Sequence, residues 1–406
     1  MKILIVSNLF PPNAVGGYER MCADVAEALA AGGAEVSVLT SDYGRKEGTF
    51  ERLAVMKTLR LHADRNDIYA PFQATAEERS AIDRANDKAF DAAVAKVGPD
   101  LIFVWNLYFL GADLMERLQS CGRPVVYFLT DNWLVAAKRP ERIGAFFERH
   151  VNGSEPFEPV LDGPADIHVP ATAVFGADFM RDLYRSTGFR FDDEIVIHNG
   201  VRLAPRLAVP DRARGRLRSE GRFSLLFAGR VVDIKGVRQA VRAIARARAL
   251  APTGVEIDLT IVGDTQDAAF NAALSEEILS LGLRDHVHFE DPVPESALPG
   301  LFQAYDAYLF PSLYEPFSLT LIHALNAGIP TIASAVGGNV EIVHHGRTGL
   351  LFDKSDPSDL AEQIVRLLGD GELRRTLSSR GQAIAARFTF ERMMERLERA
   401  LAKAAA

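Results

Sequence analysis

The chain has few cysteines, no excess of basic residues and no long apolar run. Its 406 residues include only Cys22 and Cys121, which cannot build a disulfide framework and form no Cys-x-x-Cys metal spacing. There are 46 Lys and Arg against 54 Asp and Glu, so a nucleic-acid partner is not expected. The first apolar run, Met1–Val6, is too short for a signal peptide core or a membrane span. We therefore expect a cytoplasmic protein whose membrane contact is at most peripheral, at the inner face.

Motifs of common cofactor and metal sites are also missing. No Gly-x-Gly-x-x-Gly follows an apolar strand, which argues against a nicotinamide dehydrogenase. No Asp-x-Asp occurs, and the 9 histidines are scattered without ligand spacing. The pair His344-His345 is expected in a solvent-facing loop. The sequence thus predicts neither a metal nor a cofactor.

Short apolar runs alternate with amphipathic stretches, the pattern of a parallel sheet with helices on both faces. The strands predicted in the first half are Lys2–Val6, Glu35–Thr40, Leu101–Trp105, Val125–Leu129, Ile167–Pro170 and Glu194–Ile197, and the helices are Tyr18–Ala31 and Asp178–Thr187. Residues 43–66 are expected to be irregular. Residues 139–164 are expected to form an insertion with loop character.

The second half repeats this alternation. Its predicted strands are Phe223–Ala228, Ile257–Val262, Val287–Phe289, Ala307–Phe310 and Thr331–Ala333, and its helices are Val237–Leu250, Ala268–Leu281, Ser296–Tyr305, Leu319–Ala327, Pro357–Leu368 and Leu373–Arg387. The predicted division is a first domain 1–201, a Pro- and Arg-rich linker 202–222, a second domain 223–387 and an amphipathic C-terminal helix 388–406. The fold class is α/β, with two similar domains in tandem and a cleft between them.

The loop Gly229–Gly236 follows an apolar strand and precedes a helix. Such a turn leaves backbone N–H groups at the helix N-terminus, where they can bind an anion. Arg230 can hold two phosphate oxygens in a planar fork, and Lys235 adds a compact point charge. Lys235 is the only lysine between Lys138 and Lys354. The loop predicts a phosphate site, with an ordinary surface turn as the alternative.

A second loop with the same placement runs from Pro311 to Ser318. The helix after it offers further N–H groups to a phosphate, unless Ser318 acts only as its N-cap. Glu315 is placed to accept hydrogen bonds from sugar hydroxyls, with a surface ion pair as the alternative. The loop therefore predicts a site for a sugar joined to a phosphate.

Residues of the first half are predicted to line a second ligand site. Asn106, Asp131 and Asn132 follow strand ends, where ligands of open parallel sheets bind. Gly16 and Gly17 lack Cβ atoms, so their loop can approach a ligand closely. Three aromatic side chains near these strand ends could stack on sugar faces or pack in the core: Trp105, Tyr108 and Trp133.

Taken in order, these motifs resemble those of the retaining glycosyltransferases of family 4, also called group 1. The matching stretches are Phe10-Pro11-Pro12 with Gly16-Gly17-x-Glu19, Asn199-Gly200, Gly229–Gly236, Val262-Gly263-Asp264, Glu315-Pro316-Phe317, Gly337-Gly338-x-x-Glu341 and Gly346-x-Thr348-Gly349-Leu350. The resemblance covers nearly the whole chain. It implies the GT-B fold, in which two Rossmann-like domains face each other across a cleft and a C-terminal helix crosses back to the first domain.

The resemblance also implies a reaction and residues for it. A hexose-type sugar would move from a nucleoside-diphosphate donor to a glycan, lipid-linked or small-molecule acceptor, with retention and without a metal, as the departing phosphate oxygen helps to deprotonate the acceptor. The catalytic candidates are Arg230, Lys235, Glu315 and Asp131. The donor-binding candidates are Gly16, Gly17, Gly229, Gly263, Asp264, Pro316, Phe317, Ser318, Leu319, Thr320 and His323. The acceptor-side candidates are Asn106, Tyr108, Asn132 and Glu19.

The chain departs from the family pattern at several positions. The second Glu of the Glu-x7-Glu motif, which in the family receives both ribose hydroxyls, is His323. Three interpretations of His323 stay open. It could make the pocket tolerant of a donor without the 2′-hydroxyl, contact another part of the donor, or only pack on its helix. Ser318 replaces a glycine, and the His of a first-domain His-Asp pair is replaced by Thr130, next to Asp131.

These departures leave two alternatives open. One is a nucleotide-sugar epimerase of the same fold, which would use a cleft histidine such as His198 or His323. The other is a non-catalytic protein that only binds nucleotide sugars. The donor sugar and base, the acceptor and the oligomeric state are not predicted.

The absence of a carboxylate pair spaced for a metal leads to the first prediction. Positive side chains and helix N-termini would neutralise the leaving diphosphate, so sugar transfer should continue in excess EDTA. The measurement is the initial rate of nucleoside-diphosphate release with and without chelator. Loss of the rate in EDTA, restored by Mg²⁺ or Mn²⁺, would contradict the metal-free mechanism.

Overall fold

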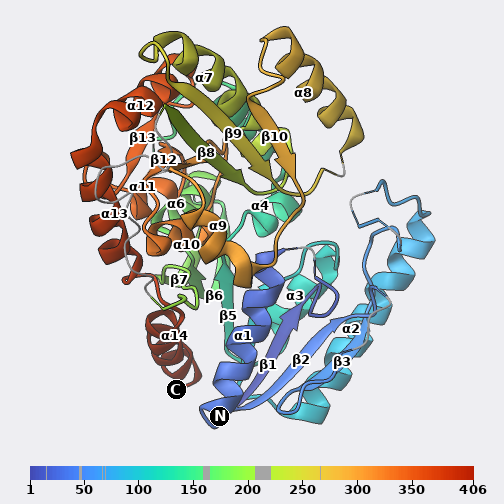
Figure 1. The fold of residues 1–406 in the computed structure, drawn as a ribbon. Helices are drawn as coiled ribbons and strands as arrows, with labels where there is room; N and C mark the ends of the chain where they lie inside the picture. The colour runs from blue at the N-terminus through green and yellow to red at the C-terminus, as the bar shows by residue number, and fades with distance from the viewer. Residues whose placement is uncertain are drawn as a thin grey trace. The chain divides into compact units, whose positions relative to one another are not determined.

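The computed structural model describes residues 1–14, 16–44, 48–65, 67–68, 70–158, 165–205, 221–265 and 267–406. These residues form two compact units. Unit 1 comprises Met1–Phe146, Phe157–His198 and Met393–Ala406, and unit 2 comprises Phe147–Pro156 and Asn199–Arg392. Each unit is a sheet flanked by helices (Figure 1). Most of the predicted linker 202–222 lies outside the described residues.

Unit 1 is built on a parallel sheet of seven strands within the described residues, in the order β3-β2-β1-β4-β5-β6-β7 (Figure 1). The strands are β1 (Lys2–Ser7), β2 (Glu35–Ser41), β3 (Ala54–Leu59), β4 (Leu101–Asn106), β5 (Val125–Leu129), β6 (Ile167–Phe175) and β7 (Phe189–Val196). The inner strands β4 and β5 are buried along their whole length. Side chains on both faces of these strands are apolar because helices cover both faces of a parallel sheet.

The helices that accompany this sheet are α1 (Gly17–Ala31), α2 (Ala76–Val97), α3 (Ala112–Ser120), α4 (Trp133–Lys138), α5 (Pro140–Phe146), α6 (Asp178–Ser186) and most of α14 (Phe390–Ala405). The sequence analysis did not predict α2, because its buried side holds few apolar residues, which are Phe90, Ala93 and Val97, beside the polar Asn86. A local signal was present. Glu78 accepts a hydrogen bond from the N–H of Thr75 at 2.7 Å, which completes a capping box.

Two expectations for irregular structure were wrong. The stretch 43–66 contains β3, an edge strand that pairs only with β2 and therefore has the partly polar sequence of a half-exposed strand. Within 139–164, α5 and the π-helix η1 (Phe147–Asn152) replace the expected loop up to residue 152, while residues 159–164 lie outside the described residues. Pro140 does not stop α5 because proline is tolerated at the first position of a helix.

Two strands are longer than predicted. β6 continues past Pro170 to Phe175, with a register shift between Val169 and Thr172. A shift of this kind accommodates a residue that has no N–H to donate to the neighbouring strand. β7 begins at Phe189 rather than at Glu194.

Unit 2 is built on a second parallel sheet, in which the described residues form six strands in the order β10-β9-β8-β11-β12-β13. The strands are β8 (Arg222–Ala228), β9 (Glu256–Val262), β10 (Val287–Glu290), β11 (Ala307–Phe310), β12 (Thr331–Ser334) and β13 (Leu350–Phe352). The helices are α7 (Val237–Leu250), α8 (Ala268–Ser280), α9 (Leu298–Gln303), α10 (Leu319–Ala327), α11 (Asn339–Ile342), α12 (Pro357–Gly369) and α13 (Gly371–Ala385), with short 3₁₀ turns η3 (Asp233–Lys235) and η4 (Glu295–Ala297). The strands and helices predicted for this half are present in the predicted order. The short elements β13 and α11 were missed.

The helices α7 and α12 pack side by side on the sheet of unit 2 (Figure 1). Their apolar residues join those of β8 and β9 in one core cluster, which includes Phe223, Leu259, Ile244 and Leu360, all fully buried. This core holds the strand ends that carry the candidate donor site.

The C-terminal helix α14 starts in unit 2 and ends in unit 1. At its start, the N–H of Phe390 donates to the carbonyl of Val201 at 2.9 Å. Further along, Arg396 donates to the carbonyl of Val196 and Lys403 to the carboxylate of Asp193, each at 2.7 Å. The helix therefore passes to the first unit, as the predicted fold requires. In the described parts of the chain, no helix has both the length and the apolar character needed to span a membrane.

The segment Phe147–Pro156 belongs to unit 2, although the residues on both sides of it belong to unit 1. Lys354 holds the segment there. Its Nζ donates to the carbonyl oxygens of Val151 at 2.8 Å and Gly153 at 2.9 Å. Burial lowers the pKa of Lys354, with the charge of Asp353 opposing this. The predicted domain division had no signal for this exchange, because it depends on contacts between residues about two hundred positions apart.

This contact leads to a stability prediction. Lys354→Met leaves two carbonyl oxygens without their charged donor, which should lower the free energy of unfolding by about 1–3 kcal/mol. Arg375→Met is the matched control, because Arg375 forms only an exposed pair with Glu372, and its effect should stay below about 0.5 kcal/mol. Denaturant unfolding measures both, and limited proteolysis should cut within 147–156 faster in the Lys354 variant. Unchanged unfolding and an unchanged cleavage pattern would refute the role of Lys354.

Candidate functional sites

In each sheet the strand order reverses between two inner strands, so that the connections from these two strands run in opposite directions. In unit 1 this reversal lies between β1, which leads to β2, and β4, which leads to β5. In unit 2 it lies between β8, which leads to β9, and β11, which leads to β12. Diverging loops leave a crevice at the carboxyl ends of such a strand pair, and open parallel sheets bind ligands there.

A cavity of about 250 Å³ lies at the carboxyl ends of β1 and β4. It is lined by Asn8, Leu9, Glu19, Ile68, Asn106, Tyr108, Phe109, Asp131, Asn132, Trp133 and Ala136. The structure therefore brings all four acceptor-side candidates together with the catalytic candidate Asp131. The sequence analysis missed Asn8, although it follows an apolar strand just as Asn106 does.

Backbone and amide groups tie the loops of this cavity together. The N–H of Asn8 donates to the carbonyl of Asn106 at 2.7 Å, and its Nδ2 donates to the carbonyl of Tyr108 at 3.1 Å. The Oδ1 of Asn106 accepts from the N–H of Tyr108 at 2.8 Å. Phe109 has φ 67°, a left-handed conformation that costs a non-glycine residue about 1–2 kcal/mol. Strain of this kind gathers at binding sites, where the surrounding contacts hold it in place.

The carboxylates of the cavity have different roles in this structure. Glu19 is buried and accepts a hydrogen bond from the N–H of Gly16 at 2.9 Å, which caps α1, the helix that begins at Gly17. Burial raises the pKa of Asp131 to about 6, against the hydrogen bond that Asp131 accepts from the N–H of Trp133, and the charge of Glu19 raises it further. Asp131 is thus the group of this cavity that gains or loses a proton near neutral pH.

Two of the three aromatic candidates are core residues. Trp105 is fully buried and donates its Nε1–H to the carbonyl of Tyr18 at 3.1 Å. The ring of Tyr18 lies 5.3 Å from that of Trp105. Trp133 is 2% exposed, whereas Tyr108 is 37% exposed. Tyr108 is therefore the exposed member of the set, and Trp133 lines the same cavity as a buried residue.

In unit 2, the backbones at the carboxyl ends of β8, β9 and β11 approach each other so closely that glycine is required. A Cβ on Gly263 would lie 1.8 Å from the carbonyl oxygen of Gly229, and one on Gly236 would lie 1.8 Å from that of Pro311. Gly236 also has φ 71°. These contacts draw the ends of β8, β9 and β11 together and leave room for a ligand's phosphates close to the backbone.

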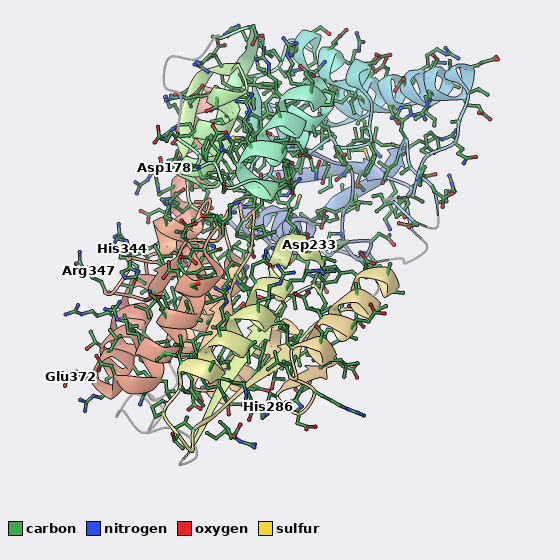
Figure 2. The ribbon with its side chains drawn as sticks, turned by 90° about the horizontal axis from the view of Figure 1, so that it is seen from above. Asp178, Asp233, His286, His344, Arg347 and Glu372 are labelled. Atoms are coloured by element: carbon green, nitrogen blue, oxygen red, sulfur yellow. The ribbon has the colours of Figure 1, made fainter. Side chains whose placement is uncertain are left out.

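The centre of this edge is an ion pair between the two predicted loops. Lys235 Nζ lies 2.7 Å from Glu315 Oε2, and the two side chains are 23% and 10% exposed. Ser312 donates to the same oxygen at 3.4 Å. Lys235 ends the turn η3, which opens at Asp233 (Figure 2). Glu315 is thus a buried carboxylate in a partly buried ion pair, not a fully exposed surface pair.

Further donor-side candidates lie on the same two loops or at the start of α10. Arg230 is exposed on the same loop as Lys235. Ser318 accepts the N–H of Leu321 at 3.0 Å and so serves as the N-cap of α10, whose first residues are Leu319 and Thr320. Phe317 is 6% exposed, and its ring centroid lies 5.5 Å from that of Phe388. Its side chain therefore packs in the interior and stabilises the loop.

Two further donor-side candidates, Asp264 and Pro316, make backbone contacts with the neighbouring loops. The carbonyl of Asp264 accepts the N–H of Val231 at 2.9 Å. The carbonyl of Pro316 would lie 2.3 Å from a Cβ on Gly338. Next to Glu315, the ring of Tyr314 lies 4.9 Å from that of Phe147, so the segment held by Lys354 also supports this loop.

His323 is 9% exposed on α10, and its Nε2 lies 3.3 Å from the Oε1 of Glu295. The other histidine considered for an epimerase, His198, lies 3.9 Å from Asp178 in unit 1. The pair His344 and His345 is exposed, as expected, and His344 lies with Arg347 at the surface of unit 2 (Figure 2).

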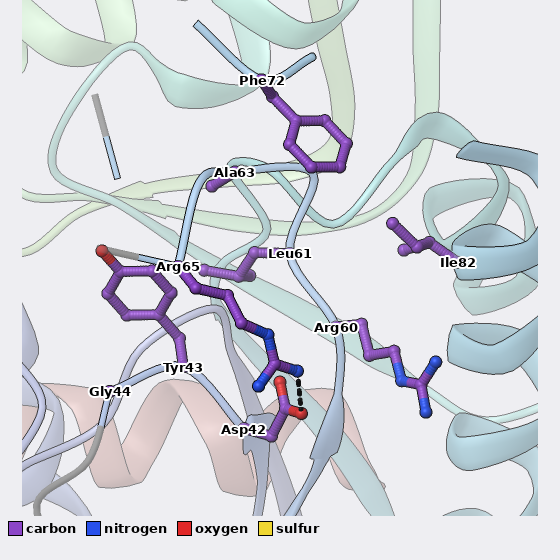
Figure 3. A pocket seen from close by; sticks show the side chains of 9 residues that line it. All are labelled: Asp42, Tyr43, Gly44, Arg60, Leu61, Ala63, Arg65, Phe72 and Ile82. Atoms are coloured by element: carbon purple, nitrogen blue, oxygen red, sulfur yellow. Dashed lines mark hydrogen bonds and ion pairs between the residues drawn. The ribbon is translucent and has the colours of Figure 1, made fainter. Parts of the chain in front are cut away.

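A second cavity of unit 1, of about 300 Å³, contains none of the predicted site residues (Figure 3). It is lined by Asp42, Tyr43, Gly44, Arg60, Leu61, Ala63, Arg65, Phe72 and Ile82. Arg65 bonds to Asp42 at 2.9 Å, as the dashed line in Figure 3 marks. The two arginines could have been noticed in the sequence, but their stretch was expected to be irregular.

Two protein-family models match the chain, one on each unit. The model described as Glycosyltransferase Family 4 matches residues 15–204, and the one described as Glycosyl transferases group 1 matches residues 211–383. The chain therefore belongs to the family 4, group 1 glycosyltransferases. The predicted family is confirmed.

Individual curated proteins of this kind are also similar to the chain. The D-inositol 3-phosphate glycosyltransferase of Salinispora arenicola is 33% identical over 213 residues, which are 50% of this chain and 48% of that protein, so the match spans about half the relative's length. An uncharacterized glycosyltransferase of Methanocaldococcus jannaschii is 24% identical over 91% of the length of this chain and 90% of the length of that protein.

Solved structures agree in fold over the full chain. Sucrose-phosphate synthase from Thermosynechococcus elongatus has a TM-score of 0.73 at 22% identity, covering 99% of this chain and 98% of that chain. Anabaena HepE in complex with UDP has a TM-score of 0.70 at 21% identity, covering 99% of this chain and all of the other. The predicted GT-B fold class is confirmed by these likenesses.

The raised pKa of Asp131 leads to a prediction on stability. The folded state binds the proton up to about pH 6, whereas the carboxyl of the unfolded chain loses it near 3.8. The resulting stabilisation is complete below pH 3.8 and is lost as the pH rises through 6, by up to roughly 3 kcal/mol. Asp131→Asn should lack this loss, so its free energy of unfolding relative to wild type should rise between pH 4.5 and 7.5.

Denaturant unfolding at the two pH values measures this difference. Asp113→Asn is the control, because Asp113 is exposed on α3. Asp113→Asn should show the pH dependence of wild type. If Asp131→Asn shows it too, burial of the Asp131 charge does not contribute to the free energy of unfolding.

Proposed function

We propose that this protein is a retaining hexosyltransferase that moves a sugar from a nucleoside-diphosphate donor to a carbohydrate or lipid-linked acceptor without a metal. Unit 2 takes the donor and unit 1 the acceptor. The observation that carries the proposal is the partly buried Lys235–Glu315 pair at the carboxyl ends of β8 and β11, in a chain of this family. It joins a phosphate-binding cation to a sugar-binding carboxylate.

The donor side stabilises the leaving group by fixed positive charge. Lys235 and Arg230 meet the diphosphate, and the first-turn N–H groups of α10 contribute the positive end of the helix dipole. When the phosphate draws Lys235 toward it, Glu315 becomes available to accept hydrogen bonds from the hydroxyls of the transferred sugar. Charges placed where negative charge develops lower the barrier without reorganisation, which is the main catalytic term here.

The acceptor side binds and orients the incoming hydroxyl. Above about pH 6 Asp131 is ionised and can accept that hydroxyl's proton in a hydrogen bond, while Asn106, Asn132 and Tyr108 bind neighbouring groups of the acceptor. The departing phosphate oxygen takes the proton as the new bond forms on the same face of the sugar. In this scheme configuration is retained without an enzyme nucleophile.

The choice of a first donor follows from the structural neighbours. HepE is described in complex with UDP and glucose and with UDP-glucose. UDP-glucose is therefore the first donor to test, followed by GDP, ADP and dTDP sugars.

The test is UDP release from UDP-glucose with and without a panel of sugar and lipid-linked acceptors. A transferase should turn over quickly only with an acceptor. Lys235→Met should lower kcat/KM by about 10²-fold, because the leaving group loses its point charge. Lys88→Met, an exposed lysine on α2, should leave it unchanged.

Removing Lys235 also leaves Glu315 buried without its partner, which can unfold the loop. The double variant Lys235→Met/Glu315→Gln removes both charges and separates folding from catalysis. A folded double variant with wild-type turnover would refute the proposal. Conversion of the donor alone would identify an epimerase, and binding without turnover a non-catalytic protein.

A further inference from the structure

His323, the residue that departs from the family's motif, contacts the carboxylate of Glu295. Glu295 opens η4, shortly after β10, and is 57% exposed. His323 lies on α10, after β11, and is nine-tenths buried. The 3.3 Å contact between Nε2 of His323 and Oε1 of Glu295 joins these two segments.

The connection between β10 and β11 places this contact on α10. β10 and β11 lie on opposite sides of β9 and β8 in the sheet of unit 2. Glu295 lies in the connection that leads from β10 to β11, and this connection packs on α10 through η4 and α9. His323 lies on α10 about 6 Å beyond the helix start that faces the phosphates. The pair thus lies where the part of the donor next to the diphosphate must fit.

The chemistry of the two side chains differs in what they can bind. A neutral imidazole has one acceptor nitrogen, whereas a carboxylate has two oxygens with about four acceptor positions. When Nε2–H of His323 donates to one oxygen of Glu295, it orients a carboxylate that is 57% exposed. A vicinal diol needs two acceptors at a fixed spacing, which one oriented carboxylate provides.

We propose that Glu295, positioned by His323, is the residue that binds the 2′- and 3′-hydroxyls of the donor's ribose. The inference rests on the proposed function, because it requires a nucleotide at this edge of unit 2. The carboxylate has moved from α10 to η4, and the histidine serves as its positioning residue. The deoxy-tolerant pocket considered from the sequence is then not expected.

The experiment is calorimetry with UDP and 2′-deoxy-UDP, repeated with the GDP and ADP pairs if UDP does not bind. Wild type should bind the ribose form about tenfold or more tightly than the deoxy form, since a charge-assisted hydrogen bond is lost. Glu295→Gln should weaken UDP by a similar factor and leave 2′-deoxy-UDP unchanged, so the ratio falls toward one. Glu276→Gln, an exposed glutamate on α8, is the control and should keep the wild-type ratio.

A rescue variant tests the geometry rather than the charge alone. Glu295→Gln/His323→Glu returns a carboxylate to α10 and should restore discrimination between the two nucleotides. If Glu295→Gln keeps the wild-type ratio, the inference is overturned while nucleotide binding, and with it the proposed function, stands. If wild type binds none of the ribonucleoside diphosphates, the proposed function fails and the inference with it.

Discussion

Both sheets are parallel throughout, and this constraint organises the candidate sites. Parallel strands end at one edge, so the loops that follow them gather there regardless of their distance in sequence. In unit 1 this brings Asn8, Asn106 and Asp131 to one cavity, and in unit 2 it brings Lys235 to Glu315. Gly236 is a direct consequence, because its backbone meets that of Pro311 at the reversal between β8 and β11 and leaves no space for a Cβ.

The charges at these edges are costly, and their partners explain why they are tolerated. A buried carboxylate needs a cation or several donors. Glu315 has Lys235, and Glu19 has the N–H of Gly16. Asp131 has weaker compensation, so its pKa rises.

Local sequence patterns predicted most strands and missed several elements, among them the short α3, α4, α11 and β13. Apolar runs predicted the inner strands, since these are buried on both faces. They missed β3 at an edge and the polar helix α2, whose formation depends on contacts and a capping box more than on an apolar face. Residues 140–152 also looked like a loop, yet they fold as helix, and part of this segment packs on unit 2, where Lys354 binds it.

The sequence by itself determined the fold class, the family and the loops on which site residues occur, because strand ends, glycine turns and helix starts are local features. It placed Lys235 and Glu315 on two such loops and Asp131 on a third. Only the tertiary structure decided which groups meet. Whether Glu315 pairs with Lys235, whether Trp105 stacks on a ligand or fills the core, and what His323 contacts depend on residues distant in the chain. Hydrogen bonds and ion pairs act over a few ångströms in space, and spacing along the sequence does not encode that distance.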